Sequence, residues 1–395
     1  MAKDAIVIVA AARTPMGGFQ GDFSDLGAVE LGSAAISCAV ERAELGVEDV
    51  NEVLMGCVLP AGLGQAPARQ AALGAGLSQA VPCSTINKMC GSGMKTVMMA
   101  YEGLHARPDD VIVAGGMESM TNAPYLLPKV RGGLRLGHGE IKDHMFLDGL
   151  EDAYDSGTLM GVFAEATARH YQFTRQAQDE FAITSLQRAK KAIDDGSFDG
   201  EVTPVSFKTR KGEVTISHDE QPAKANIDKI PELRAAFAKD GTVTAANSSS
   251  ISDGAAALVL MRQSVAEKRG VTPLARIAGC ASHAQEPAWF TTAPVGAMTK
   301  LFEMTGWSKD NVDLFEINEA FAVVTMAAMR ELDIPHDKVN VHGGACALGH
   351  PIGASGARII VTLLAALKQH NQTRGVASLC IGGGEATAVA VELFN

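Results

Sequence analysis

An internal repeat is the feature of this sequence that most constrains its fold. In each half of the chain, three motifs follow one another at similar intervals: a strand, a glycine-rich turn that leads into an apolar helix, and a strand that ends in glycines. The early motifs are VLMG (53–56), CGSGMKTVMMA (90–100) and IVAGGMES (112–119), and the late motifs are LFEIN (314–318), GASGARIIVTLL (353–364) and LCIGGGEA (379–386). The repeat predicts two related α/β halves that meet at a pseudo-twofold axis.

Apolar runs that end in glycine or polar residues alternate with helical periodicity, which is typical of parallel βαβ units. We expect strands at Ala5 to Ala12, Val53 to Val58, Leu274 to Gly279, Leu314 to Ile317 and Ala377 to Ile381, and a helix near Glu30 to Glu44. The segment from Thr121 to Ser250 differs, because it is richer in charge, Gly, Pro and turn signals. We interpret it as an insertion that carries loops and a few helices.

Charge and cysteine usage exclude several kinds of partner. The chain has a formal net charge of -11, which argues against nucleic acid or an anionic membrane, since both require a basic surface. The apolar run from Ala5 to Ala12 is too short to span a bilayer. The seven cysteines are an odd number without CxxC spacing, so we expect a reduced, cytoplasmic setting with no disulfide and no metal site.

The stretch NKMCGSGMK (87–95) places Cys90 at the start of an apolar helix. The unpaired N–H groups and the positive dipole end of such a position lower the pKa of a thiol and favour the nucleophilic thiolate. Gly91 and Gly93 allow backbone and substrate to approach closely. Taken alone, however, an intracellular cysteine is more often a small buried hydrophobic residue.

A histidine lies on the second glycine-rich turn, GGACALGHPIGASG (343–356), where His350 precedes Pro351. An imidazole at this place would be held rigidly at the mouth of a site. Histidine is the usual partner of a catalytic cysteine, because imidazole accepts the thiol proton near neutral pH. The alternative for a histidine next to proline is a structural turn residue.

Two further motifs lie at the ends of strands. EINEAFA (316–322) puts Asn318 at the carboxyl end of a strand, where open α/β sheets bind ligands. Asn318 would hold a water or donate to an oxyanion there, unless it is only a helix N-cap. CIGGGEA (380–386) ends a buried strand with Cys380 and three glycines, whose N–H groups suit an oxyanion hole unless Cys380 is simply a buried turn residue.

Together these motifs closely resemble the thiolases in order, spacing and local sequence, over essentially the whole chain. Three other segments carry the resemblance: ARTPMGGFQG (12–21), GGMESMTNAPY (115–125) and GTVTAANSSSISDGAAA (241–257). The resemblance implies a thiolase-like α/β fold of two related α/β halves in a layered α/β/α/β/α arrangement, with an inserted loop domain. The implied domains are an N-terminal half (1–120 plus 251–273), a loop domain for tetramerisation and CoA binding (121–250) and a C-terminal half (274–395).

The resemblance also implies an activity, that of an acetyl-CoA acetyltransferase, which condenses two acetyl-CoA to acetoacetyl-CoA and CoA by ping-pong Claisen chemistry, or runs the reverse thiolysis. Cys90 would be acylated, His350 would deprotonate Cys90, and Cys380 would remove an α-proton from the second acetyl-CoA. A water held on Asn318 would join His350 in receiving the enolate. The N–H groups of Cys90 and Gly382 would bind the oxyanion formed at the acyl-enzyme.

CoA would be held as part of a substrate, since the resemblance implies no permanently bound cofactor. Ser249 and Met160 would contact the pantetheine arm, and Lys224 or Lys229 would lie near the CoA phosphates. Residues 131–150 resemble the loop through which tetrameric members of the family associate, so we expect a homotetramer built as a dimer of dimers.

The chain departs from the family pattern at three places. Leu159 stands where many biosynthetic members have histidine, which affects one polar contact to CoA. Glu385 follows the glycine run where Gln or Gly is more usual. Leu186 stands where potassium-activated relatives have tyrosine, which weakens the case for a bound alkali ion.

Three other readings compete with this one. A 3-ketoacyl-CoA thiolase of degradation would have the same residues and a longer acyl pocket, so chain-length kinetics would separate the two enzymes. A ketoacyl synthase on the same fold would replace Cys380 with histidine or asparagine. A non-catalytic CoA or lipid binder would be expected to have lost Cys90, His350 or Cys380, all of which are present.

Overall fold

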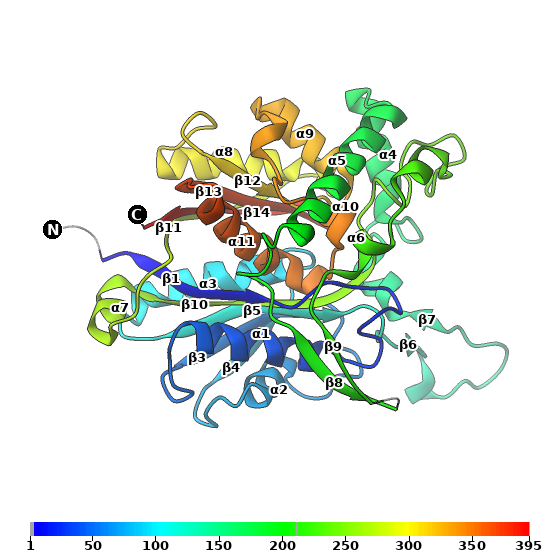
Figure 1. Ribbon diagram of the computed structural model, residues 1–395. Coiled ribbons are helices and arrows are strands. Elements are labelled where there is room, and N and C mark those ends of the chain that lie inside the picture. Colours follow the sequence, from blue (N-terminus) through cyan, green and yellow to red (C-terminus); the bar gives the residue numbers. More distant parts are fainter. Residues whose placement is uncertain (1–3, 211, 395) are drawn as a thin grey trace.

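The computed structural model describes residues 4–210 and 212–394 and consists of five layers of helices and strands (Figure 1). The first half contains β1 (Ile6–Arg13), β2 (Gly17–Gly18), α1 (Ala28–Arg42), β3 (Glu52–Gly56), α2 (Pro67–Gly74), β4 (Cys83–Ile86), α3 (Ser92–Ala106), β5 (Ile112–Ser119), β10 (Ser252–Arg262) and α7 (Gln263–Arg269). The second half contains β11 (Ala275–Ala284), η4 (Pro287–Thr292), α8 (Ala293–Thr305), β12 (Leu314–Ile317), α9 (Ala322–Leu332), η5 (His336–Lys338), α10 (Ala345–Leu348), α11 (Ile352–Gln369), β13 (Arg374–Ile381) and β14 (Glu385–Leu393).

The strands confirm the repeat that the motifs predict. In the first half the order across the sheet is β4-β3-β5-β10-β1, and in the second half it is β12-β13-β14-β11. In both halves the first motif strand runs parallel to the last one, β3 to β5 and β12 to β13. Strand β4 is also parallel to β3, and the remaining neighbours are antiparallel. The two sets join where β1 meets β11, through only two residue pairs.

Helices α3 and α11 form the middle layer and contact strands of both halves. Helices α1 and α2 cover the outer face of the first set of strands, and α8 and α9 cover the outer face of the second (Figure 1). This arrangement confirms the predicted α/β/α/β/α layering. Helix α11 is apolar on nearly all sides because it is enclosed by both sheets. It is long and apolar enough to cross a membrane, but 83% of it is buried inside the protein.

The segment between β5 and β10 corresponds to the predicted insertion. It contains more regular structure than the loops and few helices that we expected. It contains β6 (Tyr125–Leu126), η1 (Val130–Gly132), β7 (Lys142–Asp143), η2 (Phe146–Leu150), α4 (Met160–Tyr171), α5 (Arg175–Asp194), β8 (Val205–Thr209), β9 (Gly212–Ile216), α6 (Glu220–Lys224) and η3 (Ile227–Glu232). Helix α5 begins after Thr174, whose side chain accepts a hydrogen bond from the N–H of Ala177. The domain boundaries given above stay a prediction.

Glycines let α3 and α11 pack backbone against backbone. A Cβ atom on Gly93 would lie 2.8 Å from the backbone nitrogen of Ala357, and one on Gly356 would lie 2.3 Å from that of Met94. The two contacts are reciprocal, as expected for equivalent positions of a repeat. This close approach brings the starts of both helices together at one end of the molecule.

We predict that Gly93→Ala and Gly356→Ala each lower the free energy of unfolding by about 1–3 kcal/mol, because the added methyl group forces the helices apart. Urea unfolding followed by circular dichroism measures the change. Gly200→Ala is the matched control, since nothing lies within 4 Å of its added Cβ. Wild-type stability of Gly356→Ala would contradict the backbone contact.

Candidate active site

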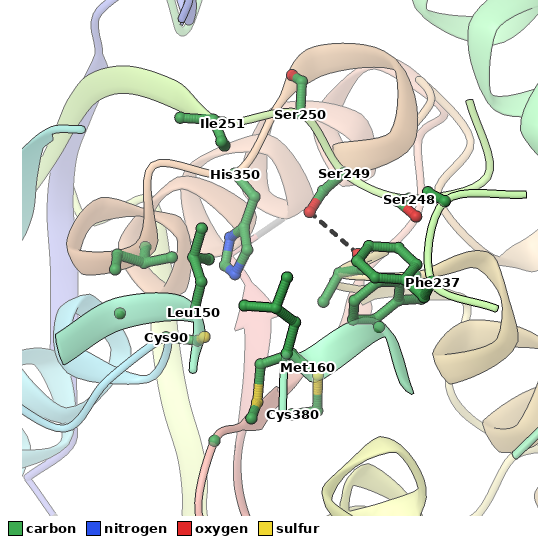
Figure 2. A pocket seen from close by; sticks show the side chains of 18 of the residues that line it. Cys90, Leu150, Met160, Phe237, Ser248, Ser249, Ser250, Ile251, His350 and Cys380 are labelled. Atoms are coloured by element: carbon green, nitrogen blue, oxygen red, sulfur yellow. Dashed lines mark hydrogen bonds between the residues drawn. The ribbon is translucent and has the colours of Figure 1, made fainter. Parts of the chain in front are cut away.

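A cavity of about 420 Å³ lies at the ends of α3 and α11. Six of the nine residues predicted for the site line it: Cys90, Met160, Ser249, His350, Cys380 and Gly382. Its walls are mostly apolar, with Leu150, Phe237, Phe290 and Ile352 among them. Figure 2 shows Cys90, His350, Met160 and Cys380 around one space. Elements of both halves and of the insertion therefore build one site.

A strained turn presents Cys90, two residues before α3 begins. Met89 has a φ of +48°, in the left-handed region that non-glycine residues rarely adopt. Side chains fix this conformation: the N–H of Met89 donates to Asn87 Oδ1 at 2.9 Å, and Ser92 Oγ accepts from the N–H of Lys88 and donates to the carbonyl of Met89. Such strain is typical of functional sites, where the surrounding structure holds it.

The thiol of Cys90 is protonated in the free protein, against the prediction from the helix N-terminus. Burial raises the pKa of Cys90 to about 11, although hydrogen bonds from the N–H groups of Gly382 and of Cys90 itself lower it. The cost of placing a thiolate in an apolar cavity exceeds the gain from the helix end. The prediction of a lowered pKa was wrong because the sequence does not reveal burial.

His350 presents an unoccupied nitrogen to the cavity. Its Nδ1 lies 2.6 Å from Ser355 Oγ, which itself donates to the carbonyl of Pro351 at 2.9 Å. The hydroxyl lone pair therefore accepts from Nδ1–H, and the lone pair of Nε2 stays available as a base. Nε2 is buried and has no hydrogen-bond partner among the residues that the structure describes. Burial, with a contribution from the Arg358 charge, lowers the pKa of His350 to about 3, so the imidazole is neutral.

Cys380 is fully buried near the end of β13. Burial raises its pKa well above the usual range, and the neighbouring Cys90 raises it further. After Ile381, residues Gly382 to Gly384 form the turn to β14, and Gly383 and Gly384 have positive φ values. The two sulfur atoms and the N–H of Gly382 thus share one side of the cavity.

Asn318 lies behind His350 and is absent from the cavity lining. Its Nδ2 is 3.4 Å from His350 Nδ1, and its Oδ1 is buried without a partner in the described part of the chain. The alternative of a helix N-cap is wrong, because α9 starts at Ala322 with Phe321 as N-cap. The adjacent Glu319 is structural, since it accepts hydrogen bonds from Ser185, Asn340 and Cys346.

The two predicted lysines lie away from the cavity. Lys224 forms ion pairs with Glu220 and, at 3.9 Å, with Asp22. Lys229 belongs to η3, outside the cavity lining. Their contact with CoA phosphates stays a prediction. Ser249 and Met160 do reach the cavity, and the Ser249 hydroxyl donates to the carbonyl of Ala320 at 3.0 Å.

Comparison with known proteins decides the family. The family model for the thiolase N-terminal domain matches residues 6–264, and that for the thiolase C-terminal domain matches residues 271–393. The chain belongs to the thiolase family. Thiolases are acyltransferases, and the fold and motifs described above fit that class.

Individual relatives match this thiolase over nearly their whole length. "Acetyl-CoA acetyltransferase" of Escherichia coli (strain K12) is 49% identical over 391 residues, which are 98% of this chain and 99% of the relative. "Acetyl-CoA acetyltransferase, mitochondrial" of Rattus norvegicus is 48% identical, covering 98% of this chain and 91% of the relative. The crystal structure of Acat5 thiolase from Ascaris suum in complex with coenzyme A superimposes with a TM-score of 0.93 at 40% identity, over 99% of this chain and all of that one.

Sequence reasoning missed one residue of this thiolase that holds the site together. The carboxylate of Glu118, at the end of β5, is fully buried and accepts N–H hydrogen bonds from Val58 at 2.9 Å, Leu59 at 3.1 Å and Gly353 at 2.8 Å. Burial raises its pKa to about 7. Glu118 ties the first half to the start of α11, next to His350. The available signal was an acidic residue inside an otherwise apolar strand motif.

The raised pKa of the Cys90 thiol leads to a prediction about its reactivity in the free protein. We expect alkylation by iodoacetamide to accelerate about tenfold per pH unit from pH 7 to 9.5, because only the thiolate reacts. Peptide mass mapping of the Cys90 adduct measures the rate, and Cys90→Ala identifies background labelling. A rate that levels off near pH 8 would show that the thiolate is already favoured.

Proposed function

We propose that this thiolase is an acetyl-CoA C-acetyltransferase, which condenses two acetyl-CoA to acetoacetyl-CoA and CoA and also catalyses the reverse thiolysis. One observation carries the proposal: Cys90, Cys380 and the free Nε2 of His350 surround a single apolar cavity. The names of the relatives from Escherichia coli and Rattus norvegicus support the acetyl group as the unit transferred.

In the first half-reaction, Cys90 Sγ attacks the thioester carbonyl of acetyl-CoA while His350 Nε2 takes the thiol proton. The N–H groups of Cys90 and Gly382 receive the negative oxygen of the tetrahedral intermediate. Collapse breaks the bond to the CoA sulfur, which leaves with the proton from His350. The products are acetyl-Cys90 and CoA, and His350 is again neutral.

In the second half-reaction, His350 Nε2 takes the thiol proton of Cys380, and the resulting thiolate removes an α-proton from a second acetyl-CoA. The enolate oxygen is met by His350 and by a water held on Asn318. The α-carbon then attacks the acetyl carbonyl, and the bond to Cys90 Sγ breaks. Acetoacetyl-CoA leaves, Cys380 keeps the α-proton as its thiol, and the proton on His350 restores the thiol of Cys90, so that the starting state returns.

Burial of the thiols explains why both half-reactions need an acid–base partner. A neutral thiol beside a neutral imidazole is the stable resting pair, because an ion pair in this apolar cavity loses its hydration. Negative charge therefore develops only when a substrate is bound, on the thioester oxygen that lies in the oxyanion hole. The dry cavity then strengthens each hydrogen bond to the transient oxyanion.

CoA thioesters enter as substrates, with Met160 and Ser249 along the pantetheine arm and Lys224 or Lys229 toward the phosphates. The neighbour from Ascaris suum, solved with coenzyme A, supports CoA thioesters as the substrates. A broader-chain 3-ketoacyl-CoA thiolase is the second candidate, favoured by the apolar walls at Leu150, Phe237 and Phe290. Activity against 3-ketoacyl-CoA esters of increasing length separates the two.

A homotetramer in the cytoplasm completes the proposal. The loop from β6 to η2 exposes apolar side chains, including Leu134, Ile141 and Leu136, which is 99% exposed. Several exposed apolar residues in one segment favour a contact surface, and these fall within the segment that resembles the family's tetramerisation loop. The cytoplasmic location rests on the cysteine usage of the sequence.

The acyl-enzyme gives the decisive test. We expect incubation with acetyl-CoA to add a single acetyl group, visible by intact mass, and we expect Cys90→Ala to lose it. Cys38→Ala, on α1 and remote from the cavity, is the matched control and should keep the adduct. A wild-type protein that stays unmodified under turnover conditions would favour the non-catalytic CoA binder.

Cys380→Ala should separate the two half-reactions. We expect acetyl-Cys90 to form, while acetoacetyl-CoA synthesis falls by about 10²–10⁴-fold, the usual contribution of a general base. Rapid-quench mass spectrometry follows the adduct, and a coupled assay follows the product. Condensation at the wild-type rate in Cys380→Ala would exclude Cys380 as the base.

A further inference from the structure

An ion pair joins the two turns that carry the oxyanion-hole donors. Lys88 Nζ pairs with Glu385 Oε2, and the two side chains are 22% and 38% exposed. Lys88 lies two residues before Cys90, and Glu385 lies directly after the turn of Gly382 to Gly384. The pair therefore connects a turn of the first half with a turn of the second.

The glycine turn has no side chain of its own that anchors it. The residues on its two sides, Ile381 and Glu385, anchor it instead, and both contact the turn that presents Cys90. Ile381 packs against Gly91 so closely that a Cβ on Gly91 would lie 2.3 Å from Ile381 Cδ1. Glu385, on the other flank, reaches Lys88. Gly382, between the two attachments, directs its N–H at Cys90 Sγ.

A second carboxylate, that of Glu118, also crosses between the two halves at this site. Glu118 crosses from the first half to the start of α11, beside His350, and binds the N–H of Gly353. Glu385 crosses in the opposite direction, to the turn that presents Cys90. Each half thus places a carboxylate on a turn of the other, although from different positions, since Glu118 lies within β5 and Glu385 begins β14.

We propose that Lys88 and Glu385 are positioning residues, whose ion pair holds the N–H of Gly382 against Cys90 and so sets the geometry of the oxyanion hole. Neither side chain lines the cavity. The catalytic consequence rests on the proposed function, whereas the effect on the Cys90 thiol does not. Small displacements of such donors are costly, because a preorganised hole loses stabilisation as its distances lengthen.

The test compares Lys88→Gln, Glu385→Gln and the reversed double variant K88E/E385K. We expect each single variant to lower the rate of Cys90 acetylation in a single turnover by about threefold to tenfold, with KM for acetyl-CoA unchanged. The reversed pair should recover to within about twofold of wild type, since the attraction remains. Raised salt should reduce the difference between wild type and the single variants, because the pair is partly exposed.

Alkylation of Cys90 by iodoacetamide provides a second readout that requires no turnover. Loss of the Gly382 contact makes the thiolate less stable, so the single variants should react more slowly at a fixed pH than wild type. Lys309→Gln is the matched control: its partner is Asp333, in another partly exposed ion pair away from the cavity. It should match wild type in both measurements.

Two results would overturn the proposal. The first is wild-type acetylation and alkylation in both single variants. The second is a raised KM in Lys88→Gln alone, which would make Lys88 a CoA contact. Thermal unfolding of every variant distinguishes local from global change, and we expect equal melting temperatures. A wild-type protein that is never acetylated would refute the proposed function, while the alkylation rates would still decide the role of the pair.

Discussion

The backbone contact between α3 and α11 is the constraint on which the site depends. Side chains at Gly93 or Gly356 would separate the two helices, and with them the turns that carry Cys90 and His350. The enclosing sheets reinforce this arrangement, because both helices lie between them and cannot move independently. The position of Cys90 relative to His350 is therefore set by the core of the protein.

Burial determines how the reactive groups behave before substrate arrives. Two thiols and one imidazole sit in an apolar space, and burial moves the pKa of each toward its neutral form. A free thiolate would be more nucleophilic, but it would also be open to oxidation and alkylation at all times. In the proposed mechanism, reactivity instead depends on how the groups are placed. A neutral thiol lies in one cavity with an imidazole that has a free lone pair, and N–H donors are directed at the thiol sulfur.

The sequence predicted what repeats or what has a fixed local pattern. The motif order predicted the two related halves and the equivalence of β3 with β12 and of β5 with β13. The resemblance to the thiolases implied the layering and the residues that meet in the cavity. The sequence did not predict properties of a residue that depend on contacts with residues distant in the chain. The pKa of Cys90 depends on burial, and the roles of Glu118 and Lys224 depend on partners that no local pattern reveals.

The reciprocal contacts at Gly93 and Gly356 also bear on how such an enzyme arises. Cys90 lies two residues before α3, and His350 lies two residues before α11. Two identical halves would carry the same residue at each pair of equivalent positions, but the aligned motifs pair Cys90 with Gly353 and His350 with Asn87. A single chain that holds both halves is free of that restriction. A nearly symmetric scaffold can therefore present a thiol from one half and an imidazole from the other.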